Sequence, residues 1–372
     1  MKILVMFVEP MLYGMDLIRE VYEKTDYEYQ YIYCHRSITG KDGLTLPENA
    51  VVCEGTDTQR KKQIEDVFKR FKPDFAVING YVGVEQTAAI RYCKKNKIKY
   101  AIESDTPLHI PSSKIKALAK KWYLKGLLSD KNCYGFAGGT AQKENLLYYG
   151  IDESRTYIMP MSISGDRLLK EYARIESKED LKKKFGVEGK KTFLFIGRLE
   201  SVKNVSLLIR AFSKLKKENP ETALFIVGDG SEREWLESLV KSECVQDVYF
   251  FGYVVFPRII EFYKAADVFV LPSSHEPWGL VVNESMTLGL PVVVSSKVGC
   301  RQDLVKDGYN GFVFENENER DLLEKLSAVC NLDLSVLSKN AIETTDRWNY
   351  GYYLECFLGA MKDVAENGRK TI

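Results

Sequence analysis

Two glutamates offer the most specific chemistry in this sequence. Glu276 and Glu284 stand in an E-x7-E arrangement within SSHEPWGLVVNESMTLGLPVV, residues 273–293. A Pro-Trp-Gly turn follows the first glutamate and an apolar run follows the second, which predicts a loop leading into a helix rather than a solvated helix face. Carboxylates in such a loop can accept hydrogen bonds from hydroxyl groups. Two glutamates at this spacing occur by chance in many charged chains, so the surrounding residues decide whether the pair indicates a functional site.

Two cations could complement these carboxylates. Arg198 and Lys203 follow an apolar run and precede a predicted helix. A guanidinium, an ammonium and the free amides of a helix start all favour the same ligand, a diphosphate. The alternative is a solvated basic turn. A second helix start, at Gly279, Leu280 and Val281, would present further amides, and the glycine allows close backbone approach.

The elements that position these residues follow a simple rhythm. Short apolar runs alternate with charged segments of helical period, which is typical of parallel βα units. The strands predicted in the first half are 2–8, 27–34, 50–53, 75–79, 99–103, 134–137 and 156–159. Those predicted in the second half are 192–196, 223–227, 248–251, 268–271, 291–295 and 311–314. Helices are predicted at 178–185, 205–217, 232–242, 258–265, 319–329 and 350–366, among others.

The polar stretch 162–191 interrupts the apolar rhythm and predicts a join between two open α/β sheets. Ligands of such sheets bind at the carboxyl ends of the strands. Four predicted strands of the second half end there in glycine or charge: Gly197-Arg198, Gly228-Asp229-Gly230, Gly252-Tyr253 and the glutamate pair.

Composition limits the class of protein. The chain has 372 residues, enough for two cores, and its 53 basic and 52 acidic residues give a net charge of +1. A partner bound through global charge, such as nucleic acid, is therefore not expected. The eight cysteines form no C-x-x-C pair, which favours reduced thiols in a cytoplasmic protein over a zinc site. The start of the chain, MKILVMFVEP, is predicted to be a strand, and no apolar run approaches the roughly 18 to 20 residues of a membrane span.

A family resemblance joins these motifs. FIGRLESVKN (195–204), VGDG (227–230), FFGYV (250–254), PSSHEPWGLVVNESMTLGLPVV (272–293) and DGYNGFVF (307–314) resemble the retaining glycosyltransferases of family 4. The resemblance implies the GT-B fold: two facing Rossmann-like domains, with a C-terminal helix that crosses back to the N-terminal domain. It implies an acceptor domain at 1–165 plus 350–372 and a nucleotide-sugar donor domain at 166–349. The N-terminal half matches only in general pattern.

The resemblance also implies roles for individual residues. Arg198 and Lys203 would hold the donor diphosphate, Glu284 the ribose and Glu276 the hydroxyls of the transferred sugar. The whole donor site would consist of Gly197, Arg198, Lys203, Gly252, Tyr253, Val254, Glu276, Gly279, Leu280, Val281 and Glu284.

The implied reaction moves a sugar from a nucleoside diphosphate, most commonly UDP, to an acceptor hydroxyl with retention of configuration. Arg198, Lys203 and Glu276 would be the catalytic residues, with Asp105 and His109 as further candidates. Because the two cations can stabilise the departing diphosphate and no D-x-D pair stands at a strand end, we expect neither a metal nor another cofactor.

The acceptor side departs from the family's pattern. Many members carry paired glycines in the first loop, where this chain has Gly14 alone. Many also place a histidine near the donor sugar, where this chain has ESDTPLH, with Asp105 at the matching place and His109 after it. Asp105 could instead cap a turn before Pro107. Gly14, Asp105 and His109 are therefore the acceptor-side candidates.

The segment SSKIKALAKKWYLKGLL, residues 112–128, concerns the partner. At helical period Ile115, Leu118, Ala119 and Trp122 form one stripe edged by lysines. Such a stripe can lie at the inner face of a membrane, or it can pack on the sheet of its own domain. The basic run 91–99 adds positive charge that would suit anionic lipid. A lipid diphosphate acceptor would suit both basic patches as well. The acceptor class that we expect is a glycan or lipid-linked glycan in cell-surface polysaccharide synthesis.

Two alternatives remain at this point. A nucleotide-sugar 2-epimerase shares the fold but needs acid and base groups at several strand ends, and this chain has only 3 histidines. A non-catalytic homologue that binds a membrane or a partner would be expected to lack at least one of Arg198, Lys203, Glu276 and Glu284.

Overall fold

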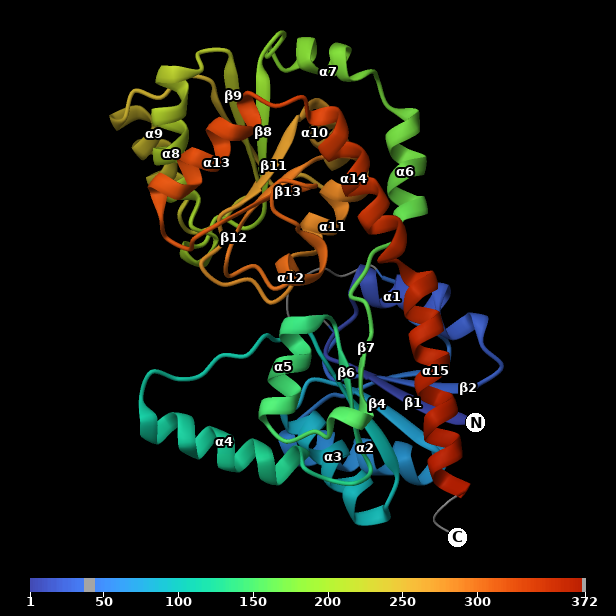
Figure 1. Cartoon of the computed structure of the whole chain (residues 1–372). Helices are drawn as coiled ribbons and strands as arrows, with labels where there is room; N and C mark the ends of the chain where they lie inside the picture. The colour runs from blue at the N-terminus through green and yellow to red at the C-terminus, as the bar shows by residue number, and fades with distance from the viewer. Residues whose placement is uncertain (37–43, 370–372) are drawn as a thin grey trace. The chain divides into compact units, whose positions relative to one another are not determined.

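The computed structural model describes residues 1–36 and 44–369. The chain forms two compact units (Figure 1), unit 1 at Met1–Ser162 with Asn349–Ile372 and unit 2 at Ile163–Trp348. The sequence analysis places the two boundaries after residues 165 and 349, and this division places them after 162 and 348.

Unit 1 is built on a sheet of 7 parallel strands in the order β3-β2-β1-β4-β5-β6-β7. The strands are β1 (Lys2–Phe7), β2 (Glu28–Tyr33), β3 (Ala50–Val52), β4 (Phe75–Asn79), β5 (Lys99–Ser104), β6 (Cys133–Ala137) and β7 (Thr156–Ile158). The central strands β1, β4 and β6 are mostly apolar, as expected for parallel strands covered on both faces.

Helices cover both faces of this sheet. The helices that precede the join are α1 (Leu12–Glu20), α2 (Asp57–Phe71), α3 (Val84–Asn96), α4 (Lys114–Leu128) and α5 (Thr140–Tyr148). One core contains side chains of α2, α3, α5 and the end of α4, and the other contains those of α1 and of α15 (Tyr350–Arg369). Unit 1 is therefore a three-layer α/β sandwich.

The C-terminal helix α15 belongs to unit 1, as expected (Figure 1). Its buried side chains Tyr353, Phe357 and Met361 join the core under β1 and β5. Tyr353 donates a hydrogen bond to Glu103 at 2.7 Å, and Tyr157 of β7 donates one to Asp363 at 2.6 Å. The predicted return of the chain to its first domain is confirmed.

Unit 2 repeats the architecture with 6 parallel strands in the order β10-β9-β8-β11-β12-β13. Its strands are β8 (Lys191–Ile196), β9 (Thr222–Val227), β10 (Val248–Gly252), β11 (Val268–Leu271), β12 (Val292–Ser295) and β13 (Gly311–Phe314). Its helices are α6 (Gly165–Arg174), α7 (Lys178–Lys184), α8 (Val205–Glu218), α9 (Arg233–Ser242), α10 (Ile259–Ala265), α11 (Leu280–Thr287), α12 (Arg301–Leu304), α13 (Glu319–Cys330) and α14 (Leu334–Arg347).

Every strand predicted from the sequence is present, whereas α6 and α14 were not predicted. Helix α6 begins with glycine and lies inside the stretch interpreted as a polar join. Helix α14 is capped by Asp333, whose side chain accepts from Ser335 N at 3.0 Å. Both helices pack against α10 or α11 in unit 2, so tertiary contact decides their formation more than local pattern does.

Candidate functional site

At the carboxyl ends of β8 and β9 the backbones of the two strands are in close contact. Gly228 has a φ of +137°, and a Cβ atom placed on it would lie 1.8 Å from the carbonyl oxygen of Gly197. Leu199 N donates to Asp229 O at 2.9 Å, which continues the pairing past the strands. Only glycine fits at Gly228, and the loop that carries Arg198 is held against a rigid support.

The two cations of this loop differ in environment. Arg198 is exposed and forms no hydrogen bond or ion pair with any residue in the described ranges. Lys203 ends a short 3-10 turn (Ser201–Lys203) and forms an ion pair with Glu276, in which the two side chains are 16% and 13% exposed. The structure thus joins one of the two cations, Lys203, to the first glutamate, whereas Arg198 is open to solvent.

Glu276 is held from three sides. Its backbone N donates to Lys297 O at 3.1 Å, and Gly299 N donates to Glu276 O at 2.9 Å. Ser273 Oγ approaches the same carboxylate oxygen, Oε2, that Lys203 contacts, at 3.3 Å. Both side-chain contacts use Oε2 rather than Oε1.

Helix α11 starts directly beside this carboxylate. Gly279 has a φ of +97°, and a Cβ atom on it would lie 3.3 Å from Glu276 Cγ and 3.2 Å from Leu271 Cδ2. The helix begins at Leu280, followed by Val281. Their amides belong to the first turn, where a helix leaves N–H groups without intrahelical partners. Trp278 anchors the turn because it is buried and stacks on Trp348 at 5.7 Å.

Glu284 lies on α11, with its carboxylate partly buried in unit 2. Tyr263 of α10 donates a hydrogen bond to Oε2 at 2.5 Å. Burial raises the pKa of Glu284, while the hydrogen bond from Tyr263 and the charge of Arg167 oppose that shift. Sequence reasoning missed Tyr263, because nothing in the pattern of 258–265 distinguishes it from a core aromatic residue.

The remaining donor-side candidates follow β10. Gly252 has a φ of +68° and its carbonyl accepts from Gly228 N at 2.8 Å, which joins this strand end to that of β9. Tyr253 is 65% exposed and Val254 is partly buried. The first is therefore open to a ligand.

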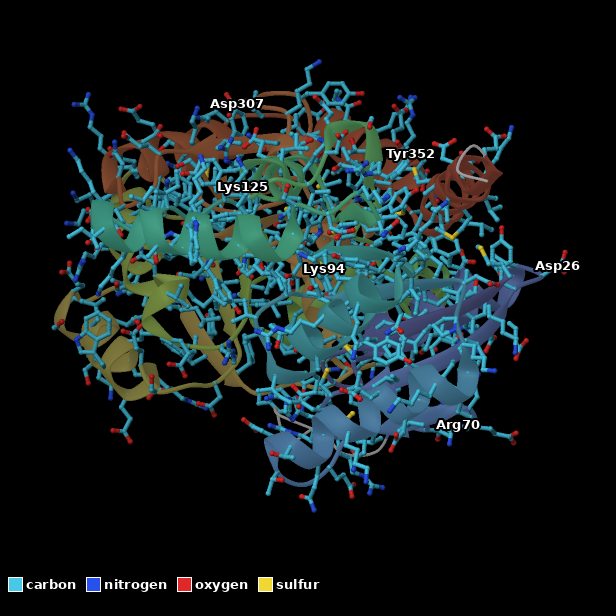
Figure 2. The ribbon with its side chains drawn as sticks, turned by 90° about the horizontal axis from the view of Figure 1, so that it is seen from below. Asp26, Arg70, Lys94, Lys125, Asp307 and Tyr352 are labelled. Carbon is cyan, nitrogen blue, oxygen red and sulfur yellow. The ribbon has the colours of Figure 1, made fainter. Side chains whose placement is uncertain are left out.

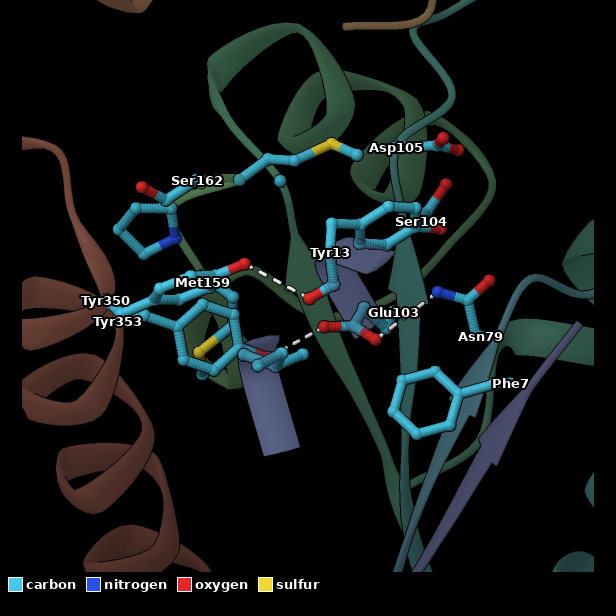
Figure 3. A pocket seen from close by; sticks show the side chains of 14 residues that line it. Phe7, Tyr13, Asn79, Glu103, Ser104, Asp105, Met159, Ser162, Tyr350 and Tyr353 are labelled. Carbon is cyan, nitrogen blue, oxygen red and sulfur yellow. Dashed lines mark hydrogen bonds between the residues drawn. The ribbon is translucent and has the colours of Figure 1, made fainter. Parts of the chain in front are cut away.

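Unit 1 has its own pocket, at the carboxyl ends of β1, β4, β5 and β6 (Figure 3). Of the acceptor-side candidates Asp105 and His109, Asp105 is among the residues that line this pocket and His109 is not. Gly14 lies in the first turn of α1, packed against Phe7, and not in the loop where the sequence analysis placed it. The helix starts at Leu12, directly after Met11, so Gly14 lies inside the helix.

A carboxylate that the sequence analysis did not select lies on the floor of this pocket. Glu103 accepts hydrogen bonds from Tyr353 at 2.7 Å and from Asn79 at 3.3 Å. Burial raises its pKa, the two hydrogen bonds oppose the shift, and the charge of Asp105 adds to it. The only sequence signal was a charged residue at the end of an apolar strand.

Helix α4 presents the predicted stripe to solvent. Ile115, Leu118 and Trp122 are 81%, 71% and 80% exposed. Only Leu124, Leu127 and Leu128, at the end of the helix, are buried. The alternative in which the stripe packs on the sheet of unit 1 is therefore wrong. The helix docks through the buried leucines of its last turns, and Lys120 and Lys121 lie over the rings of Tyr149 and Tyr148.

Basic and aromatic side chains line a groove beside the end of α4. They are Arg91, Lys94, Trp122, Tyr123 and Lys125. Lys94 of α3 donates to the carbonyl of Gly126 at 2.9 Å, which links the two helices. Figure 2 labels Lys94 and Lys125 on this side of unit 1.

None of the helices among the described residues combines the length and apolar character of a membrane span. Within the same residues, no group of three or more His, Cys, Asp or Glu side chains is placed to hold a metal ion.

Comparison with solved structures defines the class of fold. Anabaena Alr3699/HepE in complex with UDP has 17% sequence identity, covers 98% of this chain and 100% of its own, and gives a TM-score of 0.78. Together with the two parallel sheets, this likeness shows that the chain has the GT-B fold.

The family comparison concerns mainly unit 2. Residues 177–348 match the family model described as glycosyl transferases group 1. An uncharacterized glycosyltransferase of Methanocaldococcus jannaschii is 41% identical over 138 residues, 37% of this chain and 35% of that protein. The alpha-monoglucosyldiacylglycerol synthase of Streptococcus pneumoniae is 27% identical over 221 residues, 56% of this chain and 50% of that protein. The chain thus spans about a third to a half of the length of these curated relatives.

Proposed function

We propose that this protein is a retaining glycosyltransferase of family 4 that moves a sugar from a nucleoside diphosphate, preferably UDP, to an acceptor hydroxyl. The observation that carries the proposal is the Lys203–Glu276 ion pair in unit 2, in which Lys203 belongs to the same loop after β8 as exposed Arg198. These residues stand at the strand ends where open α/β sheets bind ligands. The match of residues 177–348 to glycosyl transferases group 1 and the UDP bound by Anabaena Alr3699/HepE support it.

Charge accounts for the chemistry. When the bond between the sugar and the diphosphate breaks, negative charge grows on the departing phosphate. Arg198, Lys203 and the amides at Gly279 and Leu280 would meet that charge more strongly in the transition state than in the ground state. The acceptor hydroxyl would attack the anomeric carbon from the face that the diphosphate leaves, and its proton would pass to the departing phosphate. The protein would then need neither a separate general base nor a covalent nucleophile.

The two glutamates take different tasks in this proposal. Glu276 would accept hydrogen bonds from hydroxyls of the transferred sugar through Oε1, since both of its side-chain contacts use Oε2. Glu284, oriented by Tyr263, would accept from the ribose. Gly252, Tyr253 and Val254 would adjoin the base. No metal or other cofactor is part of the proposal, because the two cations supply the positive charge that the leaving group requires.

A donor screen that records nucleoside diphosphate release tests the proposal. Release should occur with one or more UDP-sugars, should require an acceptor for full rate, and should persist in excess EDTA. NMR of the product should find the donor's anomeric configuration retained. Epimerised nucleotide sugar without diphosphate release would identify a 2-epimerase instead, and turnover that EDTA abolishes would refute the metal-free mechanism.

We further propose that the acceptor is a glycan or a lipid-linked glycan used in cell-surface polysaccharide synthesis, reached by cytoplasmic protein bound at the inner face of a membrane. The exposed stripe Ile115, Leu118 and Trp122 supports this, because an apolar stripe flanked by lysines gains both burial and attraction at an anionic surface. The groove of Arg91, Lys94 and Lys125 adds positive charge beside the stripe. The relative that synthesises a glucosyl diacylglycerol, at 27% identity, agrees with a lipid acceptor.

Vesicle flotation tests the membrane surface. Vesicles of phosphatidylcholine with phosphatidylglycerol should retain the protein at low salt, and pure phosphatidylcholine should retain much less. Trp122→Ser with Leu118→Ser should abolish retention, whereas Val336→Ser, an equally simple change at a 60% exposed position of unit 2, should not. Equal retention of both variants would exclude α4 as the contact.

A further inference from the structure

The pocket of unit 1 has a chemical character that the donor site lacks. It has a volume of about 50 Å³ and lies where β1, β4, β5 and β6 end, with α15 along one side (Figure 3). Phe7, Leu17, Met159 and Pro160 supply apolar walls, and Tyr353 closes the side formed by α15. In Figure 3 Glu103 lies between Tyr353 and Asn79, with Tyr13 above it.

Two carboxylates face this space, and no lysine or arginine is among the residues that line it. Glu103 lies on the floor and Asp105 at the exposed rim. The two carboxyl groups lie close enough to Tyr13 to affect its hydroxyl. Burial is the main cause that raises the pKa of Tyr13, and Asp105, Glu103 and Glu9 add to this increase. The described lining of the pocket therefore combines two acidic side chains with apolar walls.

Such a pocket limits its ligand. An ionised carboxylate only accepts hydrogen bonds and has about four lone-pair directions. Tyr353 and Asn79 use two of them. A phosphate or carboxylate group would be repelled, whereas a hydroxyl can donate to the remaining positions. Apolar and aromatic walls suit the C–H faces of a sugar ring.

We propose that this pocket binds an uncharged, hydroxyl-bearing part of the acceptor through Glu103 and excludes acceptors that are acidic at that position. The inference rests on the proposed transferase function and gives it a specificity. Glu103 is the acceptor-binding residue and Asp105 adds to the exclusion of anions. A volume of about 50 Å³ accommodates a hydroxymethyl group or one edge of a sugar and not a whole disaccharide.

The pocket and the exposed surface of α4 would then bind different parts of one acceptor. The lysine-flanked surface of α4 suits an anionic membrane, whereas the pocket suits a neutral sugar. An acceptor with a neutral terminal sugar on a lipid anchor satisfies both requirements, and a sugar phosphate free in solution satisfies neither.

Saturation-transfer NMR titrations of the full chain with three small probes test the pocket without turnover. The probes are methyl glucoside, glucuronate and glucosamine, which are neutral, anionic and cationic. Glu103→Gln removes the charge with little change of shape. Asp363→Asn is the matched control, because Asp363 also accepts a tyrosine hydroxyl at α15 but lies outside the pocket lining.

We expect methyl glucoside to bind the wild type and Asp363→Asn alike and to bind Glu103→Gln roughly tenfold more weakly, as loss of a hydrogen bond to a charged group predicts. Glucuronate should not bind the wild type. Asp105→Asn, at the exposed rim, should bring glucuronate binding severalfold closer to that of the glucoside.

Four results would overturn the proposal: no binding of methyl glucoside to the wild type, equal binding to Glu103→Gln, glucuronate binding as tight as glucoside binding, or glucosamine binding more than tenfold tighter than either. Circular dichroism shows whether Glu103→Gln is folded. If it is not, Asp105→Asn decides the test. In that case an Asp105→Asn protein with the same ratio of glucuronate to glucoside binding as the wild type refutes the proposal. The donor screen above decides the transferase proposal separately, because these titrations involve no nucleotide sugar.

Discussion

The Lys203–Glu276 ion pair gives each of its partners a second function. Without a ligand, the ammonium is neutralised by the carboxylate, and Ser273 adds a hydrogen bond to the same oxygen. A bound diphosphate would compete for the ammonium, and Glu276 would be left to accept from sugar hydroxyls. Because the two residues come from strand ends of β8 and β11, their pairing also fixes the two loops against each other.

This pairing predicts non-additive effects on catalysis. We expect Lys203→Ala to lower kcat/KM at least about a hundredfold, because it removes charge stabilisation and leaves Glu276 unpaired near the diphosphate. Glu276→Ala should also be severe, but the double variant should lose less than the product of the two single losses, with a coupling of about 1–3 kcal/mol.

Steady-state kinetics on the four proteins measures this coupling. Lys214→Ala is the control, since Lys214 forms an ion pair with Glu319 at 2.8 Å on the surface of the same unit and should change kcat/KM little. Strictly additive losses would mean that the pair does not act together on the donor.

Glu284 predicts a pH dependence of stability. Burial raises its pKa in the folded protein above the ordinary value of 4.5. The folded state then binds the proton more tightly than the unfolded state, so its contribution to stability is fully present below pH 4.5 and is lost as pH rises through the folded pKa. Glu284→Gln, which can still accept from Tyr263, removes this loss.

Thermal unfolding from pH 4 to 8 tests the sign. The Tm of Glu284→Gln minus that of the wild type should increase as pH rises, and the two Tm values should be nearly equal at pH 4. Glu324→Gln is the control, because the Glu324 side chain is 61% exposed. The difference in Tm between this variant and the wild type should not change with pH. A gain that grows toward acid pH would contradict the assignment.

At the scale of elements, the start of α11 depends on one glycine. Gly279 combines a φ of +97° with neighbours at 3.2–3.4 Å on three sides, including Glu276. Any side chain there would strain the backbone and press on the catalytic loop. The same glycine brings the first amides of the helix beside the carboxylate.

Gly279→Ala should therefore destabilise unit 2 by about 1–3 kcal/mol and lower turnover as well. Gly186→Ala is a matched control, because Gly186 has a φ of +68° but nothing within 4 Å of the added Cβ, so it isolates the backbone strain. Urea unfolding and kinetics on both variants measure the difference. A Gly279→Ala protein no worse than Gly186→Ala in either measurement would show that the contacts around α11 do not matter.

The elements also show which features a sequence can predict. Strands buried on both faces, such as VFVL in β11 and VVVS in β12, are visible as apolar runs between polar segments. Helix α14 was missed, since its formation depends on packing against α11. The donor-side residues could be selected because they follow one another at strand ends of a single sheet. Glu103 could not, because its partner Tyr353 stands 250 positions later in the chain.

At the scale of the whole molecule, the two units differ in how the chain builds them. Unit 2 is one continuous segment, whereas unit 1 needs both ends of the chain. Helix α15 buries Tyr350, Tyr353, Phe357, Ala360, Met361 and Val364 in the core of unit 1. Burying a large apolar side chain contributes about 1.5–3 kcal/mol, so together these residues hold a large share of the stability of a domain.

Two complementary truncations test this asymmetry. The segment 163–348 contains every proposed donor residue, so expressed alone it should fold and bind UDP within a few fold of the full chain, as calorimetry can measure. A chain ending at 348 should keep UDP binding but lose the thermal transition of unit 1, because its second core would be open to water. Tyr157→Phe in the full chain is the mild control, as it removes one hydrogen bond to α15 and should cost only about 0.5–2 kcal/mol. If 163–348 folds but fails to bind UDP, the donor site requires residues outside unit 2, and the assignment of Arg198, Lys203, Glu276 and Glu284 as a sufficient nucleotide site is wrong.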